Sequence, residues 1–286
     1  MADEQVWTIG RILKWSEQYF QSRGIDTPRL DAEVLLSHVL GEKRIFLYVN
    51  FDKPLQKEEL ALYREMVKRR AAREPVAYIV GARDFMGLRF TVSPAVLVPQ
   101  PDTETLVGAV MDRLEDSGDL RIADIGTGSG AIALSLLHYM PSVTAAAVDI
   151  SGDALEIARE NAVKLGLEDR VTFYEGDLLA PLEGEKFAAV VSNPPYIPHD
   201  DIEGLEPEVK AEPHGALDGG ADGLDFYRRL VNEAGNLLTD TGFLAMEVGI
   251  DEAAQVADMA KAAGWERSEI IADLAGIDRV VVVWKK

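Results

Sequence analysis

The sequence contains no cysteine and only four histidines among its 286 residues. The absence of cysteine excludes disulfide bonds, thiolate nucleophiles and cysteine-ligated metal sites. The four histidines are scattered along the chain, so the sequence predicts no metal site. No apolar run approaches the roughly 18 residues of a membrane-spanning helix. The first residues, Met1 to Gln5, lack the apolar core of a signal peptide. We therefore expect a cytoplasmic protein without membrane contact.

Apolar residues make up 47% of the chain, which suits one large or two modest globular domains. Strand patterns alternate with helix patterns, and this order predicts an α/β fold. The seven expected strands fit a twisted, Rossmann-like sheet with helices on both faces. The last strand is the apolar run 280–284.

The net charge of −20 is distributed unevenly. Residues 1–100 carry 15 Lys and Arg against 13 Asp and Glu, whereas the remaining residues carry 14 against 36. Because residues 101–286 are so acidic, they would repel a phosphate backbone, and we expect no direct DNA binding. They would attract a basic protein partner, although solubility or adaptation to salt explains the charge equally well. The acid-rich stretch 200–212 is the best candidate for partner docking.

The N-terminal eighty or so residues have the pattern of a small helical domain. Its basic run, Lys68-Arg69-Arg70 with Arg73, is read either as a solvated face or as a surface for RNA or an acidic partner. Residues 84–98 alternate as strands around a turn at Gly87. We expect a small helical domain (1–83), a β-hairpin linker (84–100) and a larger domain with the remaining strands (101–286). The three predicted helices run from Ile9 to the stop at Gly24, from Thr27-Pro28 to Gly41, and from Lys57 to Arg73.

A glycine-rich loop follows the expected strand 121–125. It reads Asp124-Ile125-Gly126-Thr127-Gly128-Ser129-Gly130 and precedes a helix that starts at Ala131. Glycines let the backbone turn tightly and approach a ligand at the helix N-terminus. The next strand ends in Asp149, 19 residues after Gly130, close to the ~20 expected for a ribose-binding acid.

The spacing of this loop selects among nucleotide ligands. It differs from the dinucleotide fingerprint and lacks the Gly-Lys-Ser/Thr ending of a P-loop, which favours an adenosyl cofactor without phosphates. A glycine turn without a ligand is the alternative. After the third strand, 171–174, Asp177 could accept a hydrogen bond from an adenine amine and Leu178 could cover the ring. A simple cap is an equal explanation of Asp177.

The four residues Asn193-Pro194-Pro195-Tyr196 follow the strand-like run 187–192. The prolines fix their own φ and push the residues before them toward extended geometry. The resulting stiff turn could offer the Asn193 side-chain oxygen and the Pro194 carbonyl to one planar NH2 group, which Tyr196 could cover. The pattern indicates methylation of an amino or amide nitrogen, whereas the alternative is a structural loop.

With these two segments the chain resembles the class I S-adenosylmethionine methyltransferases, and among them the release-factor glutamine methyltransferases. Those enzymes methylate the glutamine side-chain amide of the Gly-Gly-Gln motif in class I peptide chain release factors. The resemblance implies that the cofactor is S-adenosyl-L-methionine, held by the glycine loop, Asp149, Leu178 and Asn193, and that Asn193 to Tyr196 hold the substrate amide. It covers nearly the whole chain and rests on Pro99-Gln100-Pro101-Asp102-Thr103-Glu104, Asp124 to Gly130, Asn193 to Tyr196, Glu212 to Arg228, and Asp273 to Arg279.

The chain departs from the family pattern at three positions. Gln100 stands where the family usually has Arg, Leu178 where many members have an aromatic residue, and Glu252 where Gln is usual. Two other functions are retained as alternatives: a DNA or RNA amine methyltransferase, and a scaffold that binds the cofactor without chemistry. We expect a monomer that acts on a protein substrate.

Overall fold

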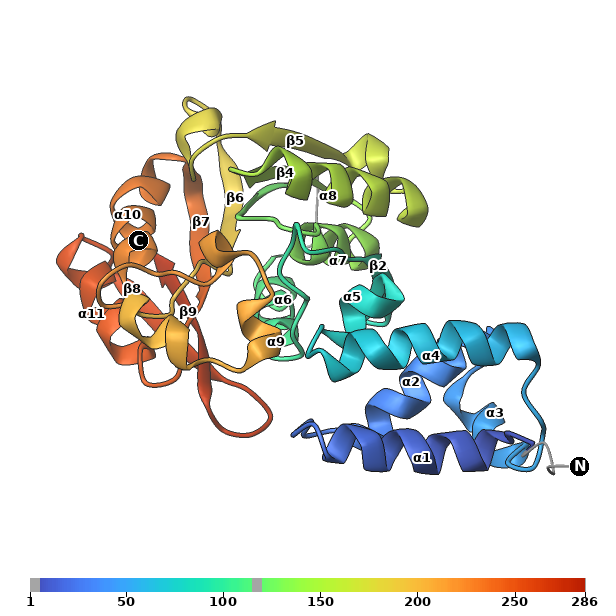
Figure 1. Cartoon of the computed structure of the whole chain (residues 1–286). Helices are drawn as coiled ribbons and strands as arrows, with labels where there is room; N and C mark the ends of the chain where they lie inside the picture. Colours follow the sequence, from blue (N-terminus) through green and yellow to red (C-terminus); the bar gives the residue numbers. More distant parts are fainter. Residues whose placement is uncertain (1–5, 115–119, 286) are drawn as a thin grey trace, which may run out of the picture. The chain divides into compact units, whose positions relative to one another are not determined.

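The computed structural model describes residues 6–114 and 120–285. These residues form two compact units (Figure 1), which are described separately here. One contains the residues up to Gly81 together with the segment Glu206–Ala211, and the other contains Ala82–Leu205 and Glu212–Lys286. The acidic residues 1–5, used above to argue against a signal peptide, lie outside the described residues. Within the described ranges, no helix has the length and apolar character needed to cross a membrane.

The helical unit packs around Tyr63, a fully buried residue whose hydroxyl donates to Ser16 Oγ at 2.9 Å. All three predicted helices are confirmed, and three short ones, α3, α5 and α9, were missed. Thr27 occupies the predicted N-cap, but its hydroxyl donates to Asp31 Oδ1 at 2.8 Å and does not cap the backbone. The helices are α1 (Ile9–Gln21), α2 (Pro28–Leu40), α3 (Arg44–Val49), α4 (Lys57–Ala71), α5 (Val76–Val80) and α9 (Pro207–Lys210).

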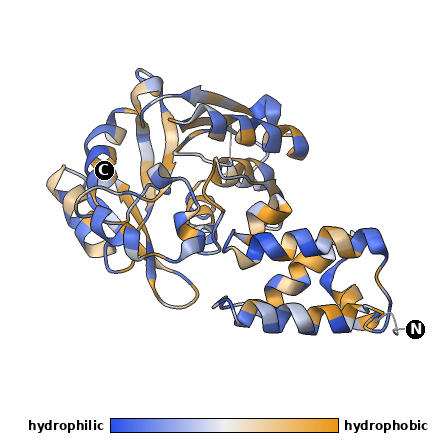
Figure 2. Ribbon diagram, in the orientation of Figure 1, coloured by the Kyte–Doolittle hydropathy of each residue, from blue (hydrophilic) through white to orange (hydrophobic). Residues whose placement is uncertain are grey.

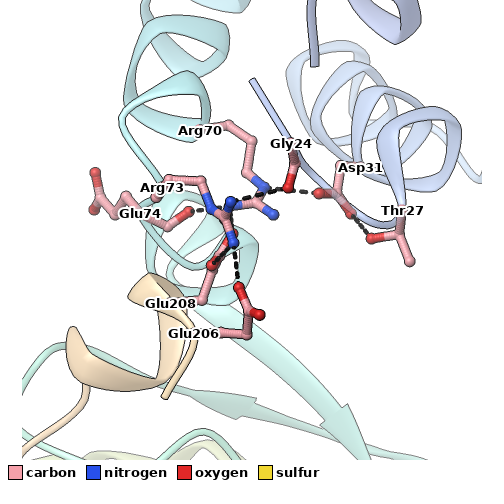
Figure 3. Close-up of polar contacts among 8 residues, drawn as sticks. All are labelled: Gly24, Thr27, Asp31, Arg70, Arg73, Glu74, Glu206 and Glu208. Carbon is pink, nitrogen blue, oxygen red and sulfur yellow. Dashed lines mark hydrogen bonds and ion pairs between the residues drawn. The ribbon is translucent and has the colours of Figure 1, made fainter. Parts of the chain in front are cut away.

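Two arginines of the predicted basic run, Arg70 and Arg73, pair with carboxylates of the same unit (Figure 3). Arg70 is buried and donates to Asp31 Oδ2 at 2.7 Å and to Glu208 Oε1 at 2.6 Å. Arg73 donates to both oxygens of Glu208 at 2.6 Å and to Glu206 Oε2 at 2.8 Å. We call these five residues the arginine–glutamate clamp. The prediction of a solvated face was therefore wrong for Arg70, because ion pairs inside the unit bury it.

The larger unit is built on a seven-stranded sheet, as predicted. Its order is β5-β4-β3-β6-β7-β9-β8, and the first five strands are parallel. The penultimate position belongs to β9, which runs antiparallel to both neighbours. The strands are β3 (Leu120–Ile125), β4 (Val143–Asp149), β5 (Val171–Glu175), β6 (Phe187–Ser192), β7 (Leu238–Glu247), β8 (Arg267–Ala272) and β9 (Asp278–Trp284).

Alternate residues of these strands point into two apolar layers, since side chains in a strand alternate between its faces. Ile122, Val191 and Phe243 belong to one layer with α6 and α7, and Ala123, Val190 and Leu244 belong to the other with α10 and α11. Apolar colours accordingly gather along the strands in Figure 2. The helices of this unit are α6 (Thr103–Met111), α7 (Ala131–Tyr139), α8 (Gly152–Leu165), α10 (Asp225–Glu233) and α11 (Ala253–Ala262).

Short elements complete the larger unit. The hairpin predicted within 84–98 is present as β1 (Ala82–Phe85) and β2 (Leu88–Thr91), but it starts earlier and residues 92–98 are not in strands. Both turn residues, Met86 and Gly87, have positive φ. Two such residues define the type I′ turn, which matches the twist of paired strands. Single 3-10 turns lie at η1 (Glu168–Arg170), η2 (Ala180–Leu182), η3 (His199–Gly204), η4 (His214–Ala216) and η5 (Ala234–Asn236).

Candidate active site

A cavity of about 500 Å³ lies at the carboxyl ends of the parallel strands. The chain winds one way from β3 through β4 to β5 and then returns to place β6 on the other side of β3. Ligands of open α/β sheets bind at such a switch point. The cavity is lined by residues at or just after the ends of β3 (Ile125, Gly126, Gly128), β4 (Asp149, Ile150, Ser151), β5 (Gly176, Asp177, Leu178) and β6 (Asn193, Pro194, Pro195), and by Ala95–Leu97, Pro213, Gly215, Ala216 and Phe226 among others.

The glycine loop shapes one wall of the cavity. Gly126 and Gly128 have φ of 73° and 55°, a region that residues with a side chain rarely adopt. A Cβ added at either position would meet no atom within 4 Å, because both glycines border open space. Gly130 also has positive φ, but a Cβ there would lie 2.9 Å from Leu134 Cδ1. Gly126 and Gly128 therefore border the cavity, whereas Gly130 permits close packing of α7.

The remaining loop residues hold the loop in place. Thr127 donates to Asp124 Oδ2 at 2.7 Å, and the Ser129 carbonyl accepts from Asn161 at 2.9 Å. Burial raises the pKa of Asp124 to about 6, although hydrogen bonds from Thr127 and the Ala133 N–H oppose this shift. Neither Thr127 nor Ser129 is among the described residues that line the cavity. In the structure, Thr127 and Ser129 stabilise the loop through these hydrogen bonds.

Asp149 closes the loop from the end of β4. Its Oδ2 accepts the Gly128 N–H at 2.8 Å, and its Oδ1 accepts the Ser151 N–H at 3.0 Å. These two bonds fix the carboxylate at the cavity edge, between the glycine loop and the start of α8. The acid that the sequence placed 19 residues after the loop is thus brought directly beside it.

Asp177 and Leu178 form the wall after β5. Asp177 is exposed and accepts hydrogen bonds from two nitrogens of Arg229, both at 2.9 Å, and these bonds lower its pKa. Leu178 has a φ of 49°, an unfavourable conformation for a residue with a side chain. Backbone strain of this kind concentrates at functional sites. Both residues line the cavity, and contact of Asp177 or Leu178 with an adenine stays a prediction.

The turn Asn193–Pro195 forms the opposite wall. Asn193 Nδ2 donates to Thr103 Oγ1 at 3.1 Å, so the amide nitrogen is engaged with protein. Within residues 6–114 and 120–285, no hydrogen bond to the Pro194 carbonyl is found. The turn thus has an acceptor that the sheet does not use, as the sequence predicted.

Tyr196 does not line the cavity with the other three residues of its motif. Its ring packs against the apolar layer of α10 and α11, and burial raises its pKa to about 12. A Cβ at Gly223 would lie 2.4 Å from the Tyr196 carbonyl oxygen, and one at Gly219 2.8 Å from its Cα. The glycines of the segment 212–228 therefore allow the chain to pass close behind the turn.

The motif Pro99–Glu104 joins three neighbouring parts of this unit. Asp102 pairs with Arg279 at 2.9 Å, Thr103 accepts from Asn193, and Glu104 accepts the Met86 N–H at 2.8 Å. Sequence comparison singled out this motif and the Asp273–Arg279 segment, and the structure shows that they meet. The departure at Glu252 is accommodated locally, because its carboxylate accepts the Gly249 N–H at 3.0 Å.

Two of the histidines described above as scattered are neighbours in space. His199 Nδ1 lies 2.8 Å from Asp218 Oδ2, and His214 Nδ1 lies 3.9 Å from the same oxygen. The hydrogen bond to Asp218 raises the pKa of His199. The chain brings them together because Ile197 forms a bridge with Asp218, a contact invisible in the sequence.

Several other features of the site were missed from sequence alone. The loop Ala95–Leu97 and the side chain of Phe226 line the cavity, but nothing in their residue types predicts it. Pro213, Gly215 and Ala216 also line it, and they belong to the segment that the resemblance had marked. Three acids of the predicted docking stretch are engaged within the chain. Glu206 and Glu208 belong to the clamp, and Glu212 accepts the Val98 N–H at 2.8 Å.

Comparisons with known proteins agree with this architecture. Residues 11–81 match the family model described as the PrmC N-terminal domain, and residues 102–205 match the methyltransferase small domain. Among solved structures, a methyltransferase from Pyrococcus furiosus superposes with a TM-score of 0.53 at 19% identity, covering 70% of this chain and 89% of its own. The catalytic domain of hMettl16 gives 0.57 at 13% identity, covering 82% and 85%. These structures show the methyltransferase fold.

Curated relatives are much more similar in sequence. The chain is 46% identical to the release factor glutamine methyltransferase of Geobacter sulfurreducens, covering 97% of this chain and 96% of the relative. It is 47% identical to that of Moorella thermoacetica, covering 98% and 99%. Such identity over almost the whole of both chains confirms the resemblance stated from the motifs: the chain belongs to the release factor glutamine methyltransferase family.

Proposed function

We propose that this chain transfers a methyl group from S-adenosyl-L-methionine to the side-chain amide nitrogen of the glutamine in the Gly-Gly-Gln motif of class I peptide chain release factors. The observation that carries the proposal is a single cavity bordered by the glycine loop and Asp149 on one side and by Asn193–Pro195 on the other. The membership of the chain in the release factor glutamine methyltransferase family supports the same substrate.

The cavity fits an adenosyl cofactor in size and chemistry. Its volume of about 500 Å³ lies within the ~300–1,000 Å³ of small-molecule sites. Gly126 and Gly128 border it without side chains, Asp149 offers carboxylate oxygens, and Leu178 offers an apolar surface. These residues would hold the cofactor, with Asp149 on the ribose and Asp177 and Leu178 at the adenine. When bound, S-adenosyl-L-methionine supplies an electrophilic methyl group.

The turn would position the glutamine amide. An amide nitrogen is a poor nucleophile because its lone pair is delocalised into the carbonyl. Asn193 Oδ1 and the Pro194 carbonyl would accept the two amide hydrogens, direct the nitrogen lone pair and stabilise the positive charge that grows on nitrogen. Holding the reacting groups in line contributes up to ~7–11 kcal/mol in ideal cases. The displaced proton would leave to water after methyl transfer.

Partner and location follow from this substrate. The acceptor is a protein loop carrying Gly-Gly-Gln, encountered in the cytoplasm where translation terminates, and the chain acts on it as a monomer. The catalytic half carries a large excess of acid, which disfavours nucleic acid as the acceptor.

The decisive experiment offers the chain several acceptors with methyl-labelled cofactor. We expect label on class I release factors and none on DNA or RNA, with the added methyl on the Gly-Gly-Gln glutamine by peptide mass spectrometry. A release factor whose motif glutamine is replaced by alanine is the matched control. Labelling of nucleic acid alone would establish the amine methyltransferase alternative, and cofactor binding without transfer to any acceptor would establish the scaffold alternative.

Removal of the proposed acceptor tests the turn directly. Asn193→Ala should lower kcat by about two or more orders of magnitude while the cofactor Kd changes less than about threefold, since removing one preorganised transition-state contact costs ~10²–10³ in kcat. The measurements are steady-state methyl transfer and calorimetric titration of the cofactor. Near-normal turnover of this variant would remove Asn193 from the mechanism.

A further inference from the structure

Three segments that are distant in sequence converge at the turn Asn193–Pro195, which is proposed to hold the substrate amide. Asn193 follows the end of β6, Thr103 is the first residue of α6, and Glu247 is the last residue of β7. Ser192 pairs with Met246 in the parallel ladder, so the next residues, Asn193 and Glu247, continue side by side beyond it. Thr103 and Glu247 are both buried, at 5% and 2% exposure. No role described above uses Glu247.

The hydrogen bonds among these residues have a defined direction. Asn193 Nδ2 donates to Thr103 Oγ1, which uses a lone pair of the hydroxyl. The Thr103 hydrogen is then available to the Glu247 carboxyl, whose pKa both Thr103 and Asn193 lower by hydrogen bonding. An ionised carboxylate only accepts hydrogen bonds. A charged Glu247 therefore accepts hydrogens from both Thr103 and the nitrogen end of Asn193. Because the Thr103 hydrogen is engaged, Thr103 Oγ1 accepts the other Asn193 hydrogen.

Burial of the Glu247 carboxyl group at this position costs free energy. Its Oε2 is buried and has no hydrogen-bond partner within the described part of the chain. Burial of a carboxyl without full compensation is destabilising, so retention of the charge needs a function or a partner. The charged groups that act on it are Arg279 and Asp102, which pair with each other at 2.9 Å. Tyr196 lies close enough to interact electrostatically, and the Tyr227 hydroxyl donates to the Glu247 backbone carbonyl.

We propose that Glu247 is a positioning residue that, both directly and through Thr103, fixes which end of the Asn193 carboxamide faces the substrate. The inference rests on the proposed function, in which Asn193 Oδ1 accepts an amide hydrogen. The oxygen and nitrogen of a carboxamide have nearly the same shape, so only the hydrogen-bond network decides their orientation. A flipped Asn193 would present an NH2 group to the glutamine NH2, and two donors repel.

Protonation of Glu247 would remove this control. A neutral carboxyl can donate to Thr103, which frees the Thr103 hydrogen to bind Asn193 Oδ1 and so permits the flipped amide. Burial raises the pKa of Glu247 to about 7, and hydrogen bonds from Thr103 and the charge of Arg279 oppose the shift. The orienting form is the ionised one, so kcat should rise with pH through about 7 and then level off.

The test compares four variants of the full chain, with a release factor as substrate. Glu247→Gln, in which the amide can donate, should lower kcat by about ten- to a hundredfold, the range produced by losing one charge-assisted hydrogen bond. Its KM for the cofactor should be unchanged, and the rise of kcat with pH near 7 (the limb of the pH profile) should vanish. Thr103→Val should resemble it, whereas Thr103→Ser keeps the hydroxyl and should stay within about threefold of wild type. Tyr227→Phe, the matched control, removes a neighbouring hydroxyl from the Glu247 backbone and should keep the limb.

The outcomes separate this inference from the proposed function. Glu247→Gln should have no further effect in an Asn193→Ala background, because orientation matters only while the carboxamide is present. If Asn193→Ala is inactive but Glu247→Gln keeps wild-type kcat and pH profile, the inference fails and the proposed function stands. If Asn193→Ala is fully active, both fail. A uniform loss of kcat in Glu247→Gln at every pH, with the limb retained, would show a structural role and also overturn the inference.

Discussion

The arginine–glutamate clamp predicts a large difference between two acids that are two residues apart. Glu208 receives three hydrogen bonds of 2.6 Å from Arg70 and Arg73 and is 21% exposed, whereas Glu206 receives one of 2.8 Å and is 66% exposed. Breaking a buried ion pair costs ~3–5 kcal/mol, while an exposed pair contributes ~0–1 kcal/mol. Glu208 is partly exposed, and its arginines keep other partners. We therefore expect Glu208→Gln to lower the stability of this unit by about 3 kcal/mol and Glu206→Gln to lower it by under about 1 kcal/mol.

Amide hydrogen exchange of the intact chain measures this effect in the relevant unit. Peptides from α2 and α4 should lose protection in Glu208→Gln and keep it in Glu206→Gln, since exchange reports the local free energy of opening. Glu206→Gln is the matched control because it removes a charge from the same segment and from the same Arg73. Equal effects of the two substitutions, or less than about 0.5 kcal/mol for Glu208→Gln, would refute the reasoning from burial.

The pH dependence of the clamp has a definite sign. Burial alone would raise the pKa of Glu208, but hydrogen bonds from Arg73 and Arg70 lower it below its usual 4.5. An acid whose pKa is lower in the folded state contributes stability above the unfolded pKa and loses it as pH falls through the folded value. The stability difference between wild type and Glu208→Gln should therefore be full at pH 7 and shrink below about pH 4.5.

Three further substitutions test other parts of the larger unit. Asp149→Ala should raise the cofactor Kd at least tenfold in calorimetry, because it removes the proposed ribose acceptor and the anchor of Gly128; an unchanged Kd would contradict the cofactor assignment. Gly223→Ala should destabilise the chain by over about 2 kcal/mol in urea unfolding, since φ is 78° and the new Cβ would lie 2.4 Å from the Tyr196 oxygen; full stability would contradict this packing. Burial raises the pKa of Glu212 to about 7, which makes ionisation of this acid destabilising as pH rises from about 4.5 to 7. The Glu212→Gln substitution should therefore raise the free energy of unfolding by about 2–3 kcal/mol at pH 8 and leave it unchanged at pH 4. Chemical denaturation at both pH values measures this, and a lower free energy of unfolding at pH 8 would overturn the prediction.

Local chemistry was sufficient to predict the elements that carry the site. The strand 187–192 and the turn that follows it were predicted with the bounds observed for β6, because a run of apolar residues ends at two consecutive prolines. The glycine loop was equally readable, since glycine readily adopts the positive φ that Gly126 and Gly128 have. Short helices such as α3 and α5 were missed, because five or six residues carry too little periodicity to be recognised.

By itself, the sequence determined the fold class, the glycine loop, the proline turn and, through motif resemblance, the family. Each depends on residues that are adjacent in the chain or repeat at a fixed period. The tertiary structure alone decided that Arg70 meets Glu208, that His199 meets His214 and Asp218, and that Thr103 and Glu247 converge on Asn193. The contact between Arg70 and Glu208 alone joins residues 138 positions apart. These contacts exist because the strand order and the helix packing bring distant segments together, and residue type alone carries no record of that order.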